Sequence, residues 1–282
     1  MGQPTLRDVQ LVELYIAKEI KRICTKHNIR YFMSDGTLLG AVRHQGFIPW
    51  DDDMDFGMLL EDYNKFLAVA KEELSEDFFL QHVTTDPGYI MPYAKIRMNG
   101  TAVHEAVAAD REMHCGIWVD IFPFVAVEEK KVSSPLFFPV ANLLMTMYQQ
   151  KNGYDLNAVT KNKLKRMVKS MLKYLPVSKA VLRRYIFGFL QDSPKESGFC
   201  MKIRAVLGKQ FVFRREYFDQ FTQLQFEDET FSAPMCFDKV LTSEYGDYMV
   251  IPPESERKNH TMLNMEIDDA VMQKVKASFQ KT

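Results

Sequence analysis

The chain has 282 residues, of which 46% are hydrophobic and 26% charged, enough for one large globular domain or a catalytic core with an appended subdomain. Its net charge of −1 excludes an overall basic surface, so nucleic acid is not expected as a partner. The four cysteines, Cys24, Cys115, Cys200 and Cys236, form no CxxC pair, which argues against a zinc ribbon or a disulfide scaffold and fits a reducing cytosol.

The first predicted element is an amphipathic helix over about residues 5–27. Thr5 and Asp8 are suited to cap its first turn. The acidic residues of this segment exclude a secretory signal peptide, and no apolar run in the chain reaches the roughly 20 residues of a membrane span. We therefore expect a cytoplasmic protein. The helix is indicated by apolar residues at three- and four-residue steps: Val9, Val12, Ile16, Ile20 and Ile23.

A glycine turn is expected next. Residues 29–33 are typical of a short strand, which leads into a turn at Ser34–Gly36 and then into a short helix from Thr37 to about Arg43. Backbone N–H groups at a glycine turn that opens a helix can donate hydrogen bonds to phosphate oxygens. The turn is therefore a candidate phosphate site.

Carboxylates cluster after this turn and its short helix, at Asp51, Asp52, Asp53 and Asp55. Residues 53–58 alternate polar and apolar side chains, which predicts a strand. Asp53 and Asp55 then share one face, about 6.5–7 Å apart, while Asp52 points to the other side. Carboxylate oxygens are hard ligands for Mg²⁺ or Mn²⁺, so Asp53 and Asp55 can converge on one or two such ions.

Two other interpretations of the cluster fit the sequence less well. An EF-hand calcium loop does not fit, because Phe56 stands where such a loop needs glycine and Asp62 stands where it needs glutamate. A solvated acidic loop is not expected between Trp50, Phe56 and a core strand. Metal binding is therefore the favoured interpretation.

Asp120 is the next candidate, as a single carboxylate in a predicted apolar strand over residues 117–122 that Pro123 ends or places near an edge. A buried carboxylate needs a partner, which can be a cap, a salt bridge or a metal ion. Other predicted elements are a helix over 61–74 and strands over 78–83 and 90–98, separated by a turn at Pro87–Gly88.

The middle of the chain differs in composition. Residues 135–148 are apolar, and residues 156–191 contain nine basic and no acidic residues. Helical spacing in the basic stretch predicts two amphipathic helices joined near Pro176. They can be a helical cover with a solvated lysine face, or residues 135–190 can attach to the inner leaflet of a membrane, with 135–148 inserted. We expect three parts: a catalytic core at 1–130, this helical insertion at 131–195, and a C-terminal part completing the core at 196–282.

Several motifs together resemble the LicD family, which is related to fukutin-related proteins. The resemblance covers residues 1 to about 125 well and 235–262 moderately. It rests on GTLLGAVRH (36–44), FIPWDDDMD (47–55), WVDIFP (118–123), YGDY (245–248), Pro252, Pro253 and His260.

The resemblance implies an α+β nucleotidyltransferase-like fold, with a mixed sheet flanked by helices and an appended helical segment. It implies that Gly36 and Thr37 form the turn and that Asp53 and Asp55 bind metal, with Asp120 as a third carboxylate that binds an ion or acts as base. Two Mg²⁺ (or Mn²⁺) ions are expected. The cysteines lack the clustering of the zinc site of fukutin-related proteins.

The family is similar to enzymes that move phosphocholine from CDP-choline onto a glycan hydroxyl, releasing CMP; relatives use CDP-ribitol or CDP-glycerol. The expected acceptor is a cell-surface polysaccharide, teichoic acid or lipooligosaccharide, free or lipid-linked. Arg43, Lys95 and Arg97 are candidate phosphate clamps or surface salt bridges, and Asp51 is expected beside the substrate. A nucleotidyltransferase acting on an NTP and a non-catalytic glycan- or membrane-binding module are the alternatives.

Overall fold

The computed structural model describes the chain except residues 1–3, 109–110, 192–196, 258–261 and 281–282, so His260 lies outside the described residues. Helix α1 (Leu6–Lys26) begins as expected: the Thr5 side chain accepts a hydrogen bond from the Asp8 backbone N–H, and the Asp8 carboxylate accepts one from the Thr5 N–H. Its apolar stripe, which includes Val12, Ile16 and Ile20, is completely buried. The predicted first helix and its cap are confirmed.

A mixed sheet forms the centre of the molecule. Strand β2 (Met54–Leu59) runs parallel to β6 (Trp118–Ala126), and the other pairings are antiparallel. The path β1-β2-β6-β4-β3 is extended by β7, which pairs with β6 and β8. The remaining strands are β1 (Phe32–Met33), β3 (Phe78–Gln81), β4 (Ala94–Met98), β7 (Phe199–Lys202) and β8 (Val212–Arg214).

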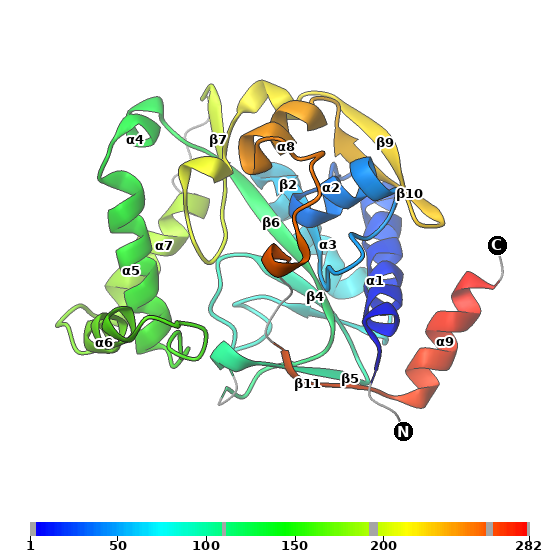
Figure 1. Cartoon of the computed structure of the whole chain (residues 1–282), viewed down its shortest axis with the longest axis horizontal. Helices are drawn as coiled ribbons and strands as arrows, with labels where there is room; N and C mark the ends of the chain where they lie inside the picture. The colour runs from blue at the N-terminus through cyan, green and yellow to red at the C-terminus, as the bar shows by residue number, and fades with distance from the viewer. Residues whose placement is uncertain (1–3, 109–110, 192–196, 258–261, 281–282) are drawn as a thin grey trace.

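Figure 1 shows β6 running diagonally through the middle, with α5, α6 and α7 together on one side of the molecule and α9 on the other. The predicted mixed sheet flanked by helices is confirmed. The helices are α2 (Asp35–His44), α3 (Leu60–Glu73), α4 (Glu129–Ser133), α5 (Phe137–Lys151), α6 (Lys163–Leu172), α7 (Lys179–Gln191), α8 (Phe237–Tyr245) and α9 (Asp269–Phe279).

Two further sheets have two antiparallel strands each: β9 (Phe221–Phe226) with β10 (Glu229–Pro234), which are consecutive, and β5 (Thr101–Glu105) with β11 (Met262–Ile267), which are far apart in the sequence. Short 3₁₀ turns complete the described structure at η1 (Ala106–Ala108), η2 (Lys209–Phe211), η3 (Arg215–Phe218) and η4 (Glu254–Glu256).

Two expectations about proline positions need correction. Strand β4 does not start at residue 90 but at Ala94, after Pro92, which has no N–H for a sheet ladder. Pro123, in contrast, does not end β6. One edge of β6 pairs first with β4, as far as Ile121, and then with β7, from Phe124 onward. Pro123, which has no backbone N–H, lies between these two partner strands. The strand continues to Ala126.

The expected turn at Gly36 is also corrected, because α2 already begins at Asp35. Asp35 has φ of 48°, in the left-handed region, so the reversal of the chain takes place at Asp35 rather than at the glycine. Gly36 and Thr37 therefore lie in the first turn of a helix. The Thr37 hydroxyl accepts a hydrogen bond of 2.8 Å from the Asp55 backbone N–H, which ties α2 to β2.

The middle segment forms helices as predicted, with α6 and α7 joined across Pro176. Helix α5 is not free to insert into a membrane as a whole, because its Phe138, Ala141 and Met145 are buried in the core. No helix among the described residues has the length and apolar content needed to cross a bilayer. The domain limits at 130 and 195 stay a prediction.

Candidate active site

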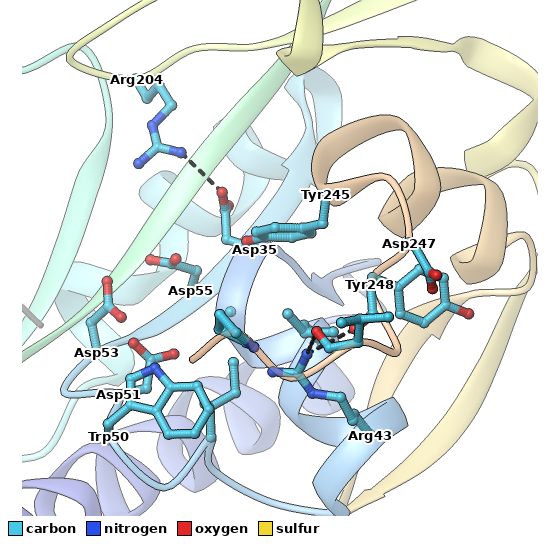
Figure 2. Close-up of a pocket in the computed structure, with 15 residues that line it drawn as sticks. Asp35, Arg43, Trp50, Asp51, Asp53, Asp55, Arg204, Tyr245, Asp247 and Tyr248 are labelled. Carbon is cyan, nitrogen blue, oxygen red and sulfur yellow. Dashed lines mark hydrogen bonds and ion pairs between the residues drawn. The ribbon is translucent and has the colours of Figure 1, made fainter. Parts of the chain in front are cut away.

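A cavity of about 460 Å³ lies where α2, the loop before β2, and the segment after α8 meet. Figure 2 shows Asp51, Asp53 and Asp55 on one side of it, with Asp35, Arg204 and Tyr245 nearby. Tyr245, Asp247 and Tyr248 also line it. The structure therefore brings the motif at 245–248 to the motifs at 36–55, although they are far apart in the sequence.

Asp55 is the most deeply buried of these carboxylates. It lies on β2, whereas Asp53 lies in the loop one residue before the strand. Burial raises the pKa of Asp55 well above its ordinary value, and the nearby carboxylates of Asp53, Asp35 and Asp120 raise it further. Its Oδ1 atom accepts no hydrogen bond from any described residue. A buried carboxylate oxygen in this state is a free ligand position for a cation.

The carboxylates of the loop converge as well. Asp51, Asp52 and Asp53 each offer an oxygen, and these oxygens lie within 4.8 Å of one another. Asp51 and Asp53 line the cavity, but Asp52 does not. Among the described residues, the expected set of Asp53, Asp55 and Asp120 does not form such a three-oxygen group. Even so, the unbonded Asp55 oxygen beside Asp51 and Asp53 fits the hard-ligand chemistry of Mg²⁺ or Mn²⁺.

Gly36 makes room for this arrangement. A Cβ atom at position 36 would lie only 2.4 Å from Asp51 Oδ2. The glycine is thus needed for the close approach of the Asp51 carboxylate to α2 rather than for a turn. Gly36 lines the cavity, while Thr37 is buried behind it.

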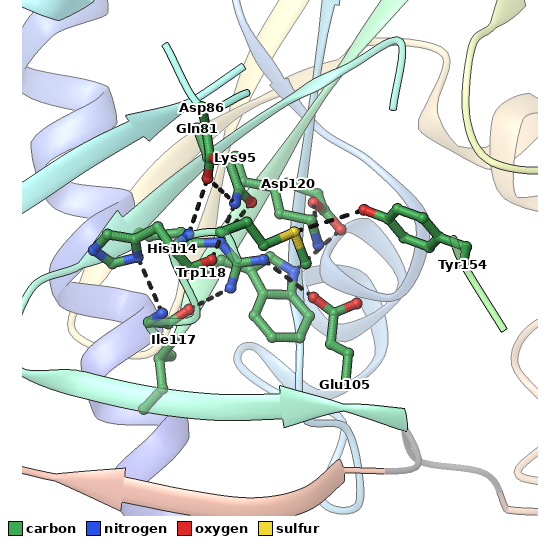
Figure 3. A network of polar contacts seen from close by, with 12 residues as sticks. Gln81, Asp86, Lys95, Glu105, His114, Ile117, Trp118, Asp120 and Tyr154 are labelled. Atoms are coloured by element: carbon green, nitrogen blue, oxygen red, sulfur yellow. Dashed lines mark hydrogen bonds and ion pairs between the residues drawn. The ribbon is translucent and has the colours of Figure 1, made fainter. Parts of the chain in front are cut away.

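Asp120 lies beside Asp55 but has partners of its own. The two residues are in register on the parallel strands β6 and β2. Lys95 Nζ is 3.1 Å from Asp120 Oδ1, and the Trp118 indole N–H donates to Asp120 Oδ2 at 3.3 Å. Figure 3 shows this buried group, in which Lys95 also lies 3.9 Å from the Trp118 ring centroid. Asp120 thus has the salt bridge that was one of the partners predicted for it, although its Oδ1 atom accepts no hydrogen bond from the described residues, and its part in metal binding stays a prediction.

Of the three candidate phosphate clamps, only Arg43 lines the cavity; Lys95 and Arg97 do not. Arg97 is completely buried and donates to Gln81 Oε1 and to the Gly116 carbonyl, so its guanidinium does not reach the cavity. Lys95 is buried beside Asp120 and is not part of the cavity lining. Arg43 does line the cavity, but its Nη1 donates to the Tyr248 carbonyl at 2.7 Å. Arg43 thereby holds the 245–250 segment over the site.

Sequence reasoning missed a group of charged residues around Asp35. Lys202 Nζ lies 2.7 Å from one Asp35 oxygen, and Arg204 Nη1 lies 2.9 Å from the other. Burial by itself raises the pKa of Asp35, but the two cations outweigh it and hold the pKa below the ordinary value. Asp35 lies in the turn expected after the predicted strand, and this position was a usable signal. Lys202 and Arg204 follow the weakly matched middle of the chain and gave none.

Lys202 also binds a second carboxylate. Its Nζ lies 2.5 Å from Glu244 Oε1, and the lysine is completely buried. Burial raises the pKa of Glu244 to about 7, although Lys202 opposes this. The lysine thus joins α2 to α8 under the floor of the cavity, and Arg204, which lines the cavity, is held by Asp35.

Comparison with known proteins identifies the family of the chain. A sequence model described as "LicD/FKTN/FKRP, nucleotidyltransferase domain" matches residues 28–142. The chain is 30% identical to the lipopolysaccharide cholinephosphotransferase LicD of Haemophilus influenzae over 267 residues, 92% of this chain and 97% of that protein. It is 44% identical to the human ribitol 5-phosphate transferase FKRP over 102 residues, 36% of this chain and 19% of that protein.

The mixed sheet and its carboxylate-lined cavity, together with these relatives, define the chain as a phosphotransferase. Because the LicD protein is matched along nearly its whole length, the chain belongs to the LicD family. The matched region contains α2, β2 and β6 as well as Asp53, Asp55 and Asp120.

Proposed function

We propose that this enzyme transfers phosphocholine from CDP-choline to a hydroxyl group of a cell-surface glycan and releases CMP. The observation that carries the proposal is one cavity that combines the carboxylates of Asp51, Asp53 and Asp55 with the guanidinium of Arg204. Choline is preferred as the alcohol because the relative matched along 97% of its length is named a cholinephosphotransferase. Transfer of ribitol phosphate is the second candidate, supported by the shorter match to FKRP.

The proposal includes Mg²⁺ or Mn²⁺ ions. Asp53 and Asp55 would hold them, with Asp51 next to them and Asp120 as the neighbouring carboxylate on β6. The unbonded Asp55 oxygen supports this assignment. Ions bound there would neutralise negative charge on the transferred phosphate and on the departing CMP.

The cations of the chain have separate tasks in this reaction. Arg204 binds a phosphate oxygen of the donor, and Asp35 fixes its guanidinium so that little side-chain entropy is lost on binding. Arg43 orders the 245–250 segment through the Tyr248 carbonyl, which places Tyr245 and Tyr248 against the donor. The reaction breaks the phosphate bond to CMP and forms one to the acceptor oxygen. The acceptor proton passes to a carboxylate of the cavity.

Product analysis tests the proposal. The purified enzyme is incubated with Mg²⁺, a glycan acceptor and, in turn, CDP-choline, CDP-ribitol, CDP-glycerol or CTP. CMP formed fastest from CDP-choline supports the proposal. CMP formed fastest from CDP-ribitol replaces choline by ribitol, and pyrophosphate released from CTP supports a nucleotidyltransferase instead. No Mg²⁺-dependent turnover with any donor would favour a non-catalytic glycan-binding module.

Matched variants identify the residues responsible. Asp53→Asn and Asp55→Asn should each lower the rate at least about 100-fold, because each removes a carboxylate that would hold the Mg²⁺ or Mn²⁺ ions against the reacting phosphates. Asp228→Asn is the control, since Asp228 forms a surface ion pair with Lys18 away from the cavity. Near-normal transfer by either site variant would defeat the assignment of these carboxylates.

A further inference from the structure

Helix α6 carries its apolar side chains on the outside. Leu164, Met167, Val168 and Met171 recur at three- and four-residue steps and so form one stripe. These side chains are 65%, 56%, 48% and 62% exposed, respectively. An amphipathic helix of a globular protein normally turns such a stripe toward the core. In the described chain, no residue of α6 is buried.

The polar side of α6 fixes this orientation. Asn157 Nδ2 donates to Ser170 Oγ at 2.9 Å, and Lys169 Nζ donates to Thr160 Oγ1 at 2.8 Å. At the end of the helix, Lys151 Nζ donates to the carbonyls of Lys173 and Leu175. The polar face is therefore bonded to the protein, and the apolar stripe points away from it.

A second cavity, of about 590 Å³, adjoins the end of this helix. It is lined by the lysines Lys151, Lys173 and Lys179 together with the start of α7. Gln150 also lines it; this side chain is only 8% exposed, and its Nε2 donates to no described residue. An unused donor beside several lysines and a helix N-terminus is suited to bind an anionic group such as a phosphate.

The charge of the surroundings identifies the partner. Residues 156–191 contain nine basic and no acidic residues. A second copy of the chain that docked through the same basic segment would present the same positive charge and be repelled. A bilayer with anionic phospholipids offers both negative headgroups and an apolar interior, and an outward apolar stripe flanked by lysines is typical of helices that lie in its interface.

We propose that α6 and the lysine-lined cavity at its end form a docking surface for a membrane that contains anionic phospholipids. The stripe enters the headgroup region, and the cavity takes a phosphate headgroup. Tyr174, which is 76% exposed beside the cavity, lies at the level of the headgroups, where aromatic residues are enriched. In Figure 1, α6 lies at the far side of the molecule from α9. The proposal does not depend on which donor or acceptor the enzyme uses.

Vesicle co-sedimentation tests the proposal directly. The full chain is mixed with vesicles of phosphatidylcholine alone or of phosphatidylcholine with phosphatidylglycerol, at low and at high salt. We expect binding to the anionic vesicles only, weakened by salt. Equal binding to both vesicle types, or no binding to anionic vesicles at low salt, would overturn the proposal.

Two double variants separate the contributions of the stripe and the cavity. Met167→Gln/Met171→Gln should weaken partitioning at least about tenfold, because two apolar side chains no longer enter the interface. Lys173→Gln/Lys179→Gln should weaken it about fivefold per lysine. Both changes are at exposed positions, and unchanged melting temperatures would confirm that the variants fold.

The matched control is Val206→Gln/Met235→Gln, which removes two apolar side chains that are 57% and 53% exposed elsewhere on the surface. The control should bind vesicles like the original protein. Equal loss in the control and the stripe variant would show a nonspecific effect and refute the proposed surface. A dimer in light scattering that only Met167→Gln/Met171→Gln dissociates would assign the stripe to self-association instead.

Discussion

Asp55 and Asp120 lie side by side as register partners on the parallel strands β2 and β6, and each contributes a carboxylate to the buried interior. Two like charges placed together away from water oppose folding. Lys95 compensates the charge of Asp120, but Oδ1 of both Asp55 and Asp120 accepts no hydrogen bond from the described residues. The site is therefore arranged for a ligand rather than for stability.

Asp55→Asn should make the metal-free protein more stable while it abolishes transfer. The amide removes a buried charge close to Asp53, Asp35 and Asp120, which we expect to raise the free energy of unfolding by about 1–2 kcal/mol. Urea unfolding in the presence of a chelator measures this. Adding Mg²⁺ should stabilise the original protein more than the variant. A variant less stable than the original in chelator would show that the Asp55 charge is compensated.

Gly36→Ala should disturb the site without weakening the fold. Alanine is preferred to glycine within a helix by about 0.5–1 kcal/mol, but the new Cβ would meet Asp51 Oδ2, whose side chain has to move. We expect an unchanged or higher melting temperature together with a lower transfer rate. Gly198→Ala is the control, because a Cβ there meets no atom within 4 Å. If both alanine variants keep full activity, the position of Asp51 is not important for the reaction.

Lys202→Met should destabilise the protein strongly. The change leaves Asp35 and Glu244 without their shared buried cation, and breaking a buried ion pair from one side costs about 3–5 kcal/mol. The double variant Lys202→Met/Glu244→Gln should recover part of this loss, because one of the two carboxylates is then neutral. Chemical denaturation of the single and double variants gives both values. Equal stabilities for the two would mean that Glu244 does not depend on Lys202.

The pH dependence of stability should contain a contribution from Glu244. Burial raises its pKa from 4.5 to about 7, so between these values the folded protein keeps a proton that the unfolded chain has lost. The stabilising contribution of Glu244 to the free energy of unfolding is therefore fully present below pH 4.5 and is lost as the pH rises to about 7. The pKa of Asp35 is lowered from 3.8, so its stabilising contribution changes in the opposite direction: it is present above this pH and is lost as the pH falls below it.

Glu244→Gln should remove the decrease in the free energy of unfolding between pH 4.5 and about 7, because glutamine carries no titrating proton. Unfolding free energies of both proteins across this pH range provide the test, and Asp228→Asn, at a surface ion pair, serves as the control. Parallel curves for the original protein and Glu244→Gln would show that Glu244 titrates normally in the folded state.

Local patterns predicted the elements that hold most of the candidate site. The capping pair Thr5 and Asp8, the alternation around Asp55, and the apolar strand that contains Asp120 each depend on neighbours a few residues away. Such short-range signals are visible in one sequence. They also placed α6 and α7 on either side of Pro176.

Long-range pairing could not be predicted in the same way. Lys202 reaches Asp35 because β7 pairs with the far end of β6, and no local sequence pattern predicts that β7 pairs there. The continuation of β6 through Pro123 likewise depends on where β4 stops and β7 starts. The outward direction of the α6 stripe depends on side-chain bonds such as Asn157 to Ser170, which periodicity alone does not contain.

The ion pairs of Asp35 affect how the enzyme can be shortened. The region matched by the family model ends at residue 142, before β7 begins at Phe199. A fragment limited to that region would retain the acidic side chains of α2 and β2 but lose Lys202 and Arg204. The recognisable part of the sequence would then carry an unbalanced negative charge in its interior. Lys202 and Arg204, which lie beyond the matched region, are thus needed for the acidic site within it to bind a phosphate.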